Sequence, residues 1–116
     1  MKEKDLLEFL ERANEKRLTE VDLESFFDAC GSEEFSLKFR FISRSLSFGN
    51  QKDSRYNDGH AVICNVDELD VECSLLFTVE DKEYAESLES GNVFISKAHV
   101  LDYDSLYRRI VFGNNG

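Results

Sequence analysis

At 116 residues the chain has the length of one domain, and its 41% hydrophobic and 33% charged residues are globular values that exclude a disordered or collagen-like class. The formal net charge of −10 disfavours general nucleic-acid binding, because cationic side chains supply most of the non-specific affinity for phosphates. The first residues, MKEKDLLEFLERANEK, contain no uninterrupted apolar segment. We therefore predict a soluble, cytoplasmic protein without a membrane segment.

The first thirty-one residues predict two amphipathic helices. The first has an apolar stripe at helical spacing, formed by Leu6, Leu7, Phe9, Leu10 and Ala13. Thr19 has the chemistry of an N-cap for the second helix, and Gly31 stands where a glycine ends a helix. The apolar stripe of that helix comprises Leu23, Phe26, Phe27 and Cys30. Because such stripes ordinarily become buried, this pair predicts a helical cap over a sheet.

From Phe35 the hydrophobic period changes from 3.6 to 2 and predicts a long strand with one buried face. Its apolar residues are first Phe35, Leu37, Phe39 and Phe41, at odd positions, and then Ile42, Leu46 and Phe48, at even positions. A regular strand cannot keep one face buried across such a switch. We therefore predict a β-bulge or sharp bend at 41–43, of the kind found in strongly curved sheets.

The rest of the chain predicts four strands and one short helix, in an order set by turn residues. A glycine-bounded polar loop comes first, at 49–59. Strands are predicted at 60–66 and 71–79, a short helix at 81–90, and two last strands at 93–101 and 106–112. The chain has no proline and no internal repeat, which indicates a single domain over 1–116 with a helical cap at 1–31.

This order of elements resembles the OB-fold, the small five-stranded Greek-key barrel with a helix between its third and fourth strands. The resemblance covers 35–113 and is carried by ESLESGNVFISKAHVLDYDSLYRRIVFG, where helix, glycine, strand, turn and strand succeed each other. We predict an α+β fold with two N-terminal helices and a five-stranded antiparallel, strongly bent sheet or OB-like barrel. An open antiparallel sheet and a small barrel of another topology are the alternatives.

The sequence contains no catalytic or metal-binding motif, so we predict a protein that is not an enzyme and holds no cofactor. Cys30, Cys64 and Cys73 are widely spaced and embedded in apolar patterns, as expected for small core side chains in a reducing compartment. His60 and His99 are not near a cysteine pair, which argues against a structural zinc site.

The distribution of charge predicts where a partner binds. Residues 61–91 carry nine acidic side chains and one basic side chain, and four of the acids cluster at Asp67, Glu68, Asp70 and Glu72. We therefore expect a small acidic interaction module that meets a basic protein partner through this cluster. An immunity or inhibitor protein that imitates nucleic acid towards a nuclease is one concrete version. The oligomeric state is left open.

The OB-fold resemblance implies a second candidate site, because ligands of that fold lie near the loops between strands 1 and 2 and between strands 4 and 5. The 1–2 loop contains Lys52, Arg55 and Tyr56, two cations and an aromatic ring that suit an anion or a base. Of the adjacent arginines in the last predicted strand, Arg108 shares its phase with the apolar residues and is the better ligand candidate. The alternative function is thus a binder of single-stranded nucleic acid, oligosaccharide or a small anion.

Overall fold

The computed structural model describes residues 2–15, 18–47, 49, 51–66 and 69–115. Two helices, α1 (Glu3–Glu15) and α2 (Glu20–Cys30), precede the strand β1 (Glu34–Leu46). The remaining elements are η1 (Ser54–Tyr56), β2 (His60–Val66), β3 (Glu72–Phe77), η2 (Val79–Asp81), α3 (Lys82–Ser87), β4 (Val93–Asp104) and β5 (Arg109–Asn114). The predicted α+β class and order of helices and strands are confirmed.

The five strands form a closed barrel in the order β1-β2-β3-β5-β4, with β4 also paired to β1. This arrangement is compatible with a small OB-like barrel. The sheet is mixed, so the expectation of a purely antiparallel sheet was wrong: β3 and β5 run parallel, with Cys73 opposite Ile110. The reason is geometric, because directions cannot alternate all the way round a closed ring with an odd number of strands. One neighbouring pair must be parallel.

The predicted bulge in the first strand is confirmed, since the register of β1 against β2 shifts between Phe41 and Ser43. Before the bulge, alternate side chains from Phe35 to Phe41 are buried in the barrel. Beyond it the expected second buried face does not form, because Ile42 is 38% exposed and Leu46 is 65% exposed. Phe48 lies outside the described residues. The strand pairs with β4 over Glu34–Arg40 and with β2 over Phe39–Leu46, so the bulge lies within the β1–β2 pairing. It does not return the later apolar side chains to the core.

The last strand begins later than predicted, at Arg109, and Leu106 to Arg108 form a turn. The Asp104 side chain accepts hydrogen bonds from the backbone N–H groups of Leu106 and Tyr107, at 3.0 and 3.2 Å. Arg108 then has a φ of 56°, in the left-handed region that a strand residue does not adopt. The hydrogen bonds accepted by the Asp104 side chain thus stabilise a turn where the last strand was predicted to begin.

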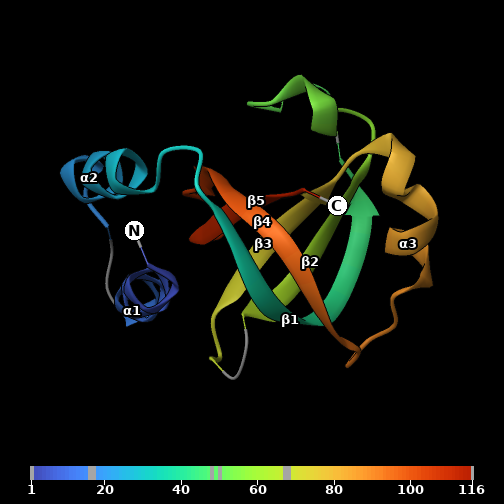
Figure 1. Ribbon diagram of the computed structural model, residues 1–116, viewed down its shortest axis with the longest axis horizontal. Helices are drawn as coiled ribbons and strands as arrows, with labels where there is room; N and C mark the ends of the chain where they lie inside the picture. The colour runs from blue at the N-terminus through green and yellow to red at the C-terminus, as the bar shows by residue number, and fades with distance from the viewer. Residues whose placement is uncertain (1, 16–17, 48, 50, 67–68, 116) are drawn as a thin grey trace.

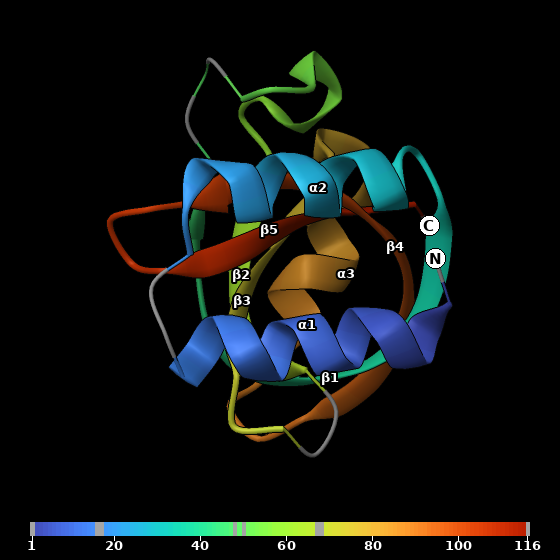
Figure 2. The same cartoon turned by 90° about the vertical axis from the view of Figure 1, so that its left-hand side faces the viewer.

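The two ends of the barrel are covered by helices. Figure 1 shows the pair α1 and α2 on one side of the barrel and α3 on the other, and Figure 2 shows α1 and α2 lying side by side across the end that faces the viewer. One cluster of buried residues includes Leu6 and Phe26 from the helices as well as Phe39 and Phe112 from the strands. The apolar faces of the two helices are thus buried against the barrel and extend its core, as expected of amphipathic helices.

Candidate functional site

The most distinctive concave feature is a groove between α1 and α2, which we call the α1–α2 groove. Its volume is about 360 Å³, and it is lined by Asp5, Glu8, Phe9, Arg12, Leu18, Asp22, Ser25, Phe26 and Ala29. The rings of Phe9 and Phe26 stack at its floor, with centroids 3.8 Å apart and planes inclined by 4°. The same apolar stripes that dock the helices on the barrel therefore provide an aromatic floor.

The rim of the groove is acidic. Asp5, Glu8 and Asp22 contribute carboxylates, and Arg12, the one cation among the described lining residues, lies with its guanidinium carbon 5.8 Å from the centroid of the Phe9 ring. Asp22 also completes a capping box, in which its carboxylate accepts from the backbone N–H of Thr19 at 3.0 Å. The start of α2 is fixed by this cap, so the position of one rim carboxylate is fixed with it.

The charge of the rim extends over both helices. Together α1 and α2 carry nine acidic side chains and two basic ones, and all nine acids are exposed. An apolar floor under carboxylates is suited to a lysine or arginine side chain, because the aliphatic stem packs on the rings while the cation stays with the acids.

Two of the four acids in the cluster predicted from the sequence, Asp70 and Glu72, are described by the structure, and neither lines the α1–α2 groove. Asp67 and Glu68 are outside the described residues. Asp70 and Glu72 line a second pocket of about 320 Å³ with Ala13, Asn14, Tyr107, Arg108 and Arg109. Within it, Nη2 of Arg109 lies 2.7 Å from Oε1 of Glu72. Two arginines thus lie beside the two described acids of the predicted cluster, so the described lining of this pocket has mixed charge.

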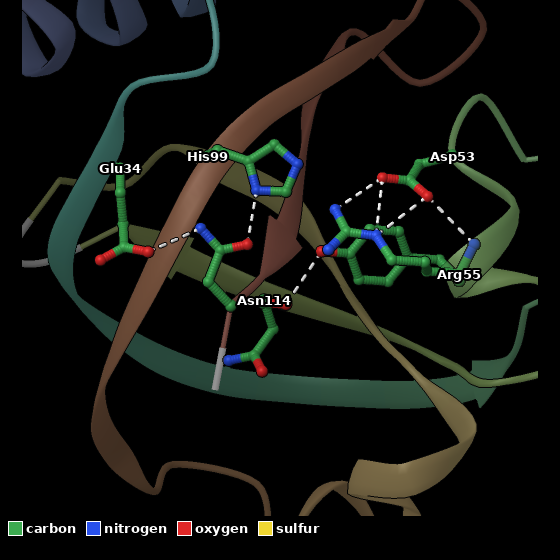
Figure 3. A network of polar contacts seen from close by, with 7 residues as sticks. Glu34, Asp53, Arg55, His99 and Asn114 are labelled. Atoms are coloured by element: carbon green, nitrogen blue, oxygen red, sulfur yellow. Dashed lines mark hydrogen bonds and ion pairs between the residues drawn. The ribbon is translucent and has the colours of Figure 1, made fainter.

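The two cations of the alternative site are both paired with carboxylates. Nζ of Lys52 lies 3.4 Å from Oδ1 of Asp102 and 5.4 Å from the centroid of the Phe27 ring. Arg55 folds back onto Asp53, at 2.7 Å between Nη2 and Oδ2 (Figure 3). The hydrogen bonds from Arg55 hold the pKa of Asp53 below its usual value. These pairings leave less positive charge for an anionic ligand than the sequence indicates.

Tyr56, the aromatic residue of the alternative site, is completely buried. Its hydroxyl donates to the backbone carbonyl of Asn114 at 2.9 Å, and a Cβ at position 113 would lie 2.5 Å from Tyr56 Oη, so only Gly113 leaves room for the ring. The ring is therefore not exposed for stacking on a base, contrary to the expectation. Tyr56 instead anchors the 49–59 loop to β5. Arg108, the fourth residue of this candidate set, lines the second pocket.

The α1–α2 groove was not predicted as a site, because an amphipathic stripe ordinarily indicates burial alone. Asp5, Glu8 and Asp22 were visible only as part of the acidic excess of residues 1–34, which carry eleven acids and five bases. That excess was the available signal. The sequence did not reveal that Phe9 stacks on Phe26, because this contact joins residues of two different helices.

All three cysteines are buried thiols rather than disulfide sulfurs, as expected of core side chains. Cys64 and Cys73 face each other across β2 and β3 with sulfur atoms 3.5 Å apart, and burial raises the pKa of Cys73 well above its usual value. Burial also raises the pKa of Cys30 to about 11. A thiol that keeps its proton at neutral pH is a poor nucleophile.

Folded protein at pH 8 is therefore expected to react with a thiol reagent at Cys30 roughly 100-fold more slowly than denatured protein, because the thiolate fraction falls tenfold for each unit of pKa. The rate should rise as the pH approaches 11. Site-resolved mass spectrometry of the labelled protein measures this. Labelling of Cys30 at the denatured rate while the fold is intact would contradict it.

Two further observations concern the described residues only. They contain no group of three or more histidine, cysteine, aspartate or glutamate side chains placed to hold a metal ion. Nor does any of the helices built from them have the length and apolar character needed to cross a bilayer.

Comparison of the chain with family models, with curated proteins and with solved structures finds no match.

Proposed function

We propose that this chain is a small acidic, non-catalytic interaction module that binds a basic protein partner, and that the α1–α2 groove receives the partner's cationic side chains. One observation carries the proposal: within the part of the chain that the structure describes, three rim carboxylates and one arginine surround a floor of stacked phenylalanine rings. A partner that inserts lysine or arginine gains contact area from the floor and charge complementarity from the rim.

The proposal moves the partner site from the predicted cluster of Asp67, Glu68, Asp70 and Glu72 to the helices. Glu72 is paired with Arg109, and a partner would have to compete with that arginine for the carboxylate. The nine acids of α1 and α2 face only two bases on the same helices. An inhibitor or immunity protein that presents carboxylates to the phosphate-binding surface of a nuclease is a concrete form of this function. We place it in the cytoplasm.

We further propose that the barrel is OB-like. The ring order β1-β2-β3-β5-β4, with α3 between β3 and β4, supports this. The alternative function, an OB-type binder of nucleic acid, oligosaccharide or a small anion, draws support from the barrel alone. The buried ring of Tyr56 and the carboxylate partners of Lys52 and Arg55 weigh against it.

The proposal predicts that removing two groove charges weakens binding of a basic peptide. For the variant Asp5→Asn/Glu8→Gln we expect roughly a fivefold to tenfold rise in the Kd of a fluorescein-labelled amphipathic lysine–leucine peptide, since each rim pair contributes up to about 1 kcal/mol. Fluorescence anisotropy at 50 mM salt measures it. Binding should weaken further at 500 mM salt, because screening reduces attraction between exposed charges.

The matched control is Glu11→Gln/Glu15→Gln, which removes the same charge from exposed positions of α1 that do not line the groove. We expect less than about a twofold change for this variant, because exposed charges outside the contact act only through the screened field. Equal weakening by both variants would assign the binding to overall charge and overturn the groove as the site. Absence of peptide binding at low salt would overturn the proposed function itself.

A further inference from the structure

A second surface of the molecule has the opposite charge. It is the outer face of the ladder between β1 and β4, where Ser36, Lys38 and Arg40 lie directly opposite Lys97, Ile95 and Val93. We call Lys38, Arg40 and Lys97, with Val93 and Ile95, the basic wall. Its three cations occupy successive levels of the ladder, and levels on one face of a strand are about 6.8 Å apart.

The cations of the basic wall differ from those of the candidate sites. Lys52, Arg55 and Arg109 each have a carboxylate partner. By contrast, Lys38, Arg40 and Lys97 form no ion pair with any described residue, and all three are exposed. Beside them Ile95 is 70% exposed and Val93 is 48% exposed. Unpaired charges around exposed aliphatic side chains are the composition of an interaction surface rather than of an inert barrel wall.

The complementary surface is present on α2 of the same chain. Glu20, Glu24 and Asp28 follow one another at i, i+4 and i+8, so they lie on one face of the helix, and we call them the acidic stripe. None of the three lines the α1–α2 groove or forms an ion pair with a described residue. Like charges at this spacing repel, and Asp28 lies near the negative end of the helix dipole, where the last turn contains no basic residue.

The spacings of the two surfaces agree. Four residues of helix rise about 6 Å, so the carboxylates of the acidic stripe repeat at nearly the interval of the cations on the basic wall. Val21, adjacent to the stripe, is 70% exposed, as is Ile95 on the wall. Each surface thus presents three charges of one sign beside an exposed aliphatic side chain.

We propose that the basic wall docks the acidic stripe of a second copy of this chain. The contact is heterologous, because one copy contributes its basic wall and the other its acidic stripe. A dimer formed in this way keeps one unoccupied wall at one end and one unoccupied stripe at the other. Further copies can therefore add head to tail and form short oligomers. One helix face on one ladder is a small contact. We therefore expect a Kd on the order of 0.1 mM at low salt. The proposal does not rest on the α1–α2 groove, which stays open in such an assembly.

Two neutralised variants test the docking. Lys38→Gln/Arg40→Gln neutralises two of the three cations of the basic wall and leaves the acidic stripe unchanged. Glu20→Gln/Glu24→Gln neutralises two of the three acids of the stripe and leaves the wall unchanged. In sedimentation velocity at 50 mM salt we expect wild-type protein to oligomerise as its concentration rises towards 1 mM and to return to monomer at 500 mM salt. Each variant alone should remain monomeric. An equimolar mixture of the two should form a one-to-one dimer and nothing larger, since only one intact wall and one intact stripe can meet.

The control variant Lys4→Gln/Lys82→Gln removes two positive charges outside the wall and should oligomerise like wild type. Circular dichroism establishes that each variant is folded, which is expected because all substituted positions are exposed.

Monomeric wild-type protein at 1 mM and 50 mM salt would overturn the proposal, as would oligomers that persist in both neutralised variants. Binding of a single-stranded oligonucleotide that is lost in Lys38→Gln/Arg40→Gln, by a chain that stays monomeric, would assign the wall to phosphates instead. Peptide binding at the groove is measured separately, so its failure is distinguishable from each of these outcomes.

Discussion

Replacement of Tyr56 by alanine is expected to lower the free energy of unfolding by about 3–5 kcal/mol, the range for truncating a buried aromatic side chain. The ring has no exposed surface, and it lies against Gly113 and beside the ring of His99, with centroids 6.2 Å apart. Its removal leaves a cavity and frees the loop that precedes β2 from β5. Chemical denaturation followed by circular dichroism measures the change.

The variant Tyr56→Phe separates the hydrogen bond from the packing. It keeps the ring and removes the hydroxyl that donates to the carbonyl of Asn114, so we expect a loss of about 1–2 kcal/mol. The pair of variants also distinguishes an anchor from a ligand-binding residue. If Tyr56→Ala left stability unchanged and only abolished binding of an anionic ligand, the anchoring role described above would be wrong.

Replacement of Gly59 by alanine is expected to destabilise the barrel by roughly 3 kcal/mol or more, the upper end of the cost of overpacking. A Cβ at this position would lie 2.0 Å from the backbone oxygen of Phe77. The clash cannot be relieved by a change of rotamer, because the opposing atom belongs to the backbone and the next residue, His60, is paired with Phe77 in the β2–β3 ladder. Thermal unfolding measures the loss.

Gly49→Ala is the matched control, since it makes the same substitution within the same stretch between β1 and β2. A Cβ at Gly49 would meet no atom of the described residues within 4 Å. We therefore expect a change in stability within about 0.5 kcal/mol, as for an ordinary surface substitution. Equal effects of the two substitutions would show that the close approach of Gly59 to Phe77 does not limit stability.

The helices and strands were largely predictable because their signals are local. The stripe from Leu6 to Ala13 and the cap at Thr19 depend on neighbours within one or two helical turns, and both are present in the structure. The bulge between Phe41 and Ser43 was predictable for the same reason, since a change of phase is visible within a single strand. A turn between the last two strands was predictable from its aspartates, but it lies at 105–108, later than predicted, because the Asp104 side chain accepts hydrogen bonds from the residues that follow it.

The candidate sites were less predictable because charge in a sequence does not reveal its counter-ions. Glu72 and Arg109 are 37 positions apart in the chain and meet only because β3 and β5 become neighbours when the barrel closes. Lys52 and Asp102 likewise meet through tertiary structure. A cation that looks available in the sequence is thus partly neutralised in the fold, and Arg108, adjacent to Arg109, is left without an ion-pair partner among the described residues.

By itself the amino-acid order determined the class of the fold, the bent first strand and the strongly acidic character, because period and composition are properties of short segments and of the whole chain. Only the tertiary structure decided which charges remain unpaired, which aromatic rings are buried and that one strand pair is parallel. These depend on barrel closure, which brings distant segments together. The stacking of Phe9 on Phe26 and the burial of Tyr56 against Gly113 are contacts of that kind: the first builds the floor of the α1–α2 groove, and the second removes the Tyr56 ring from the surface.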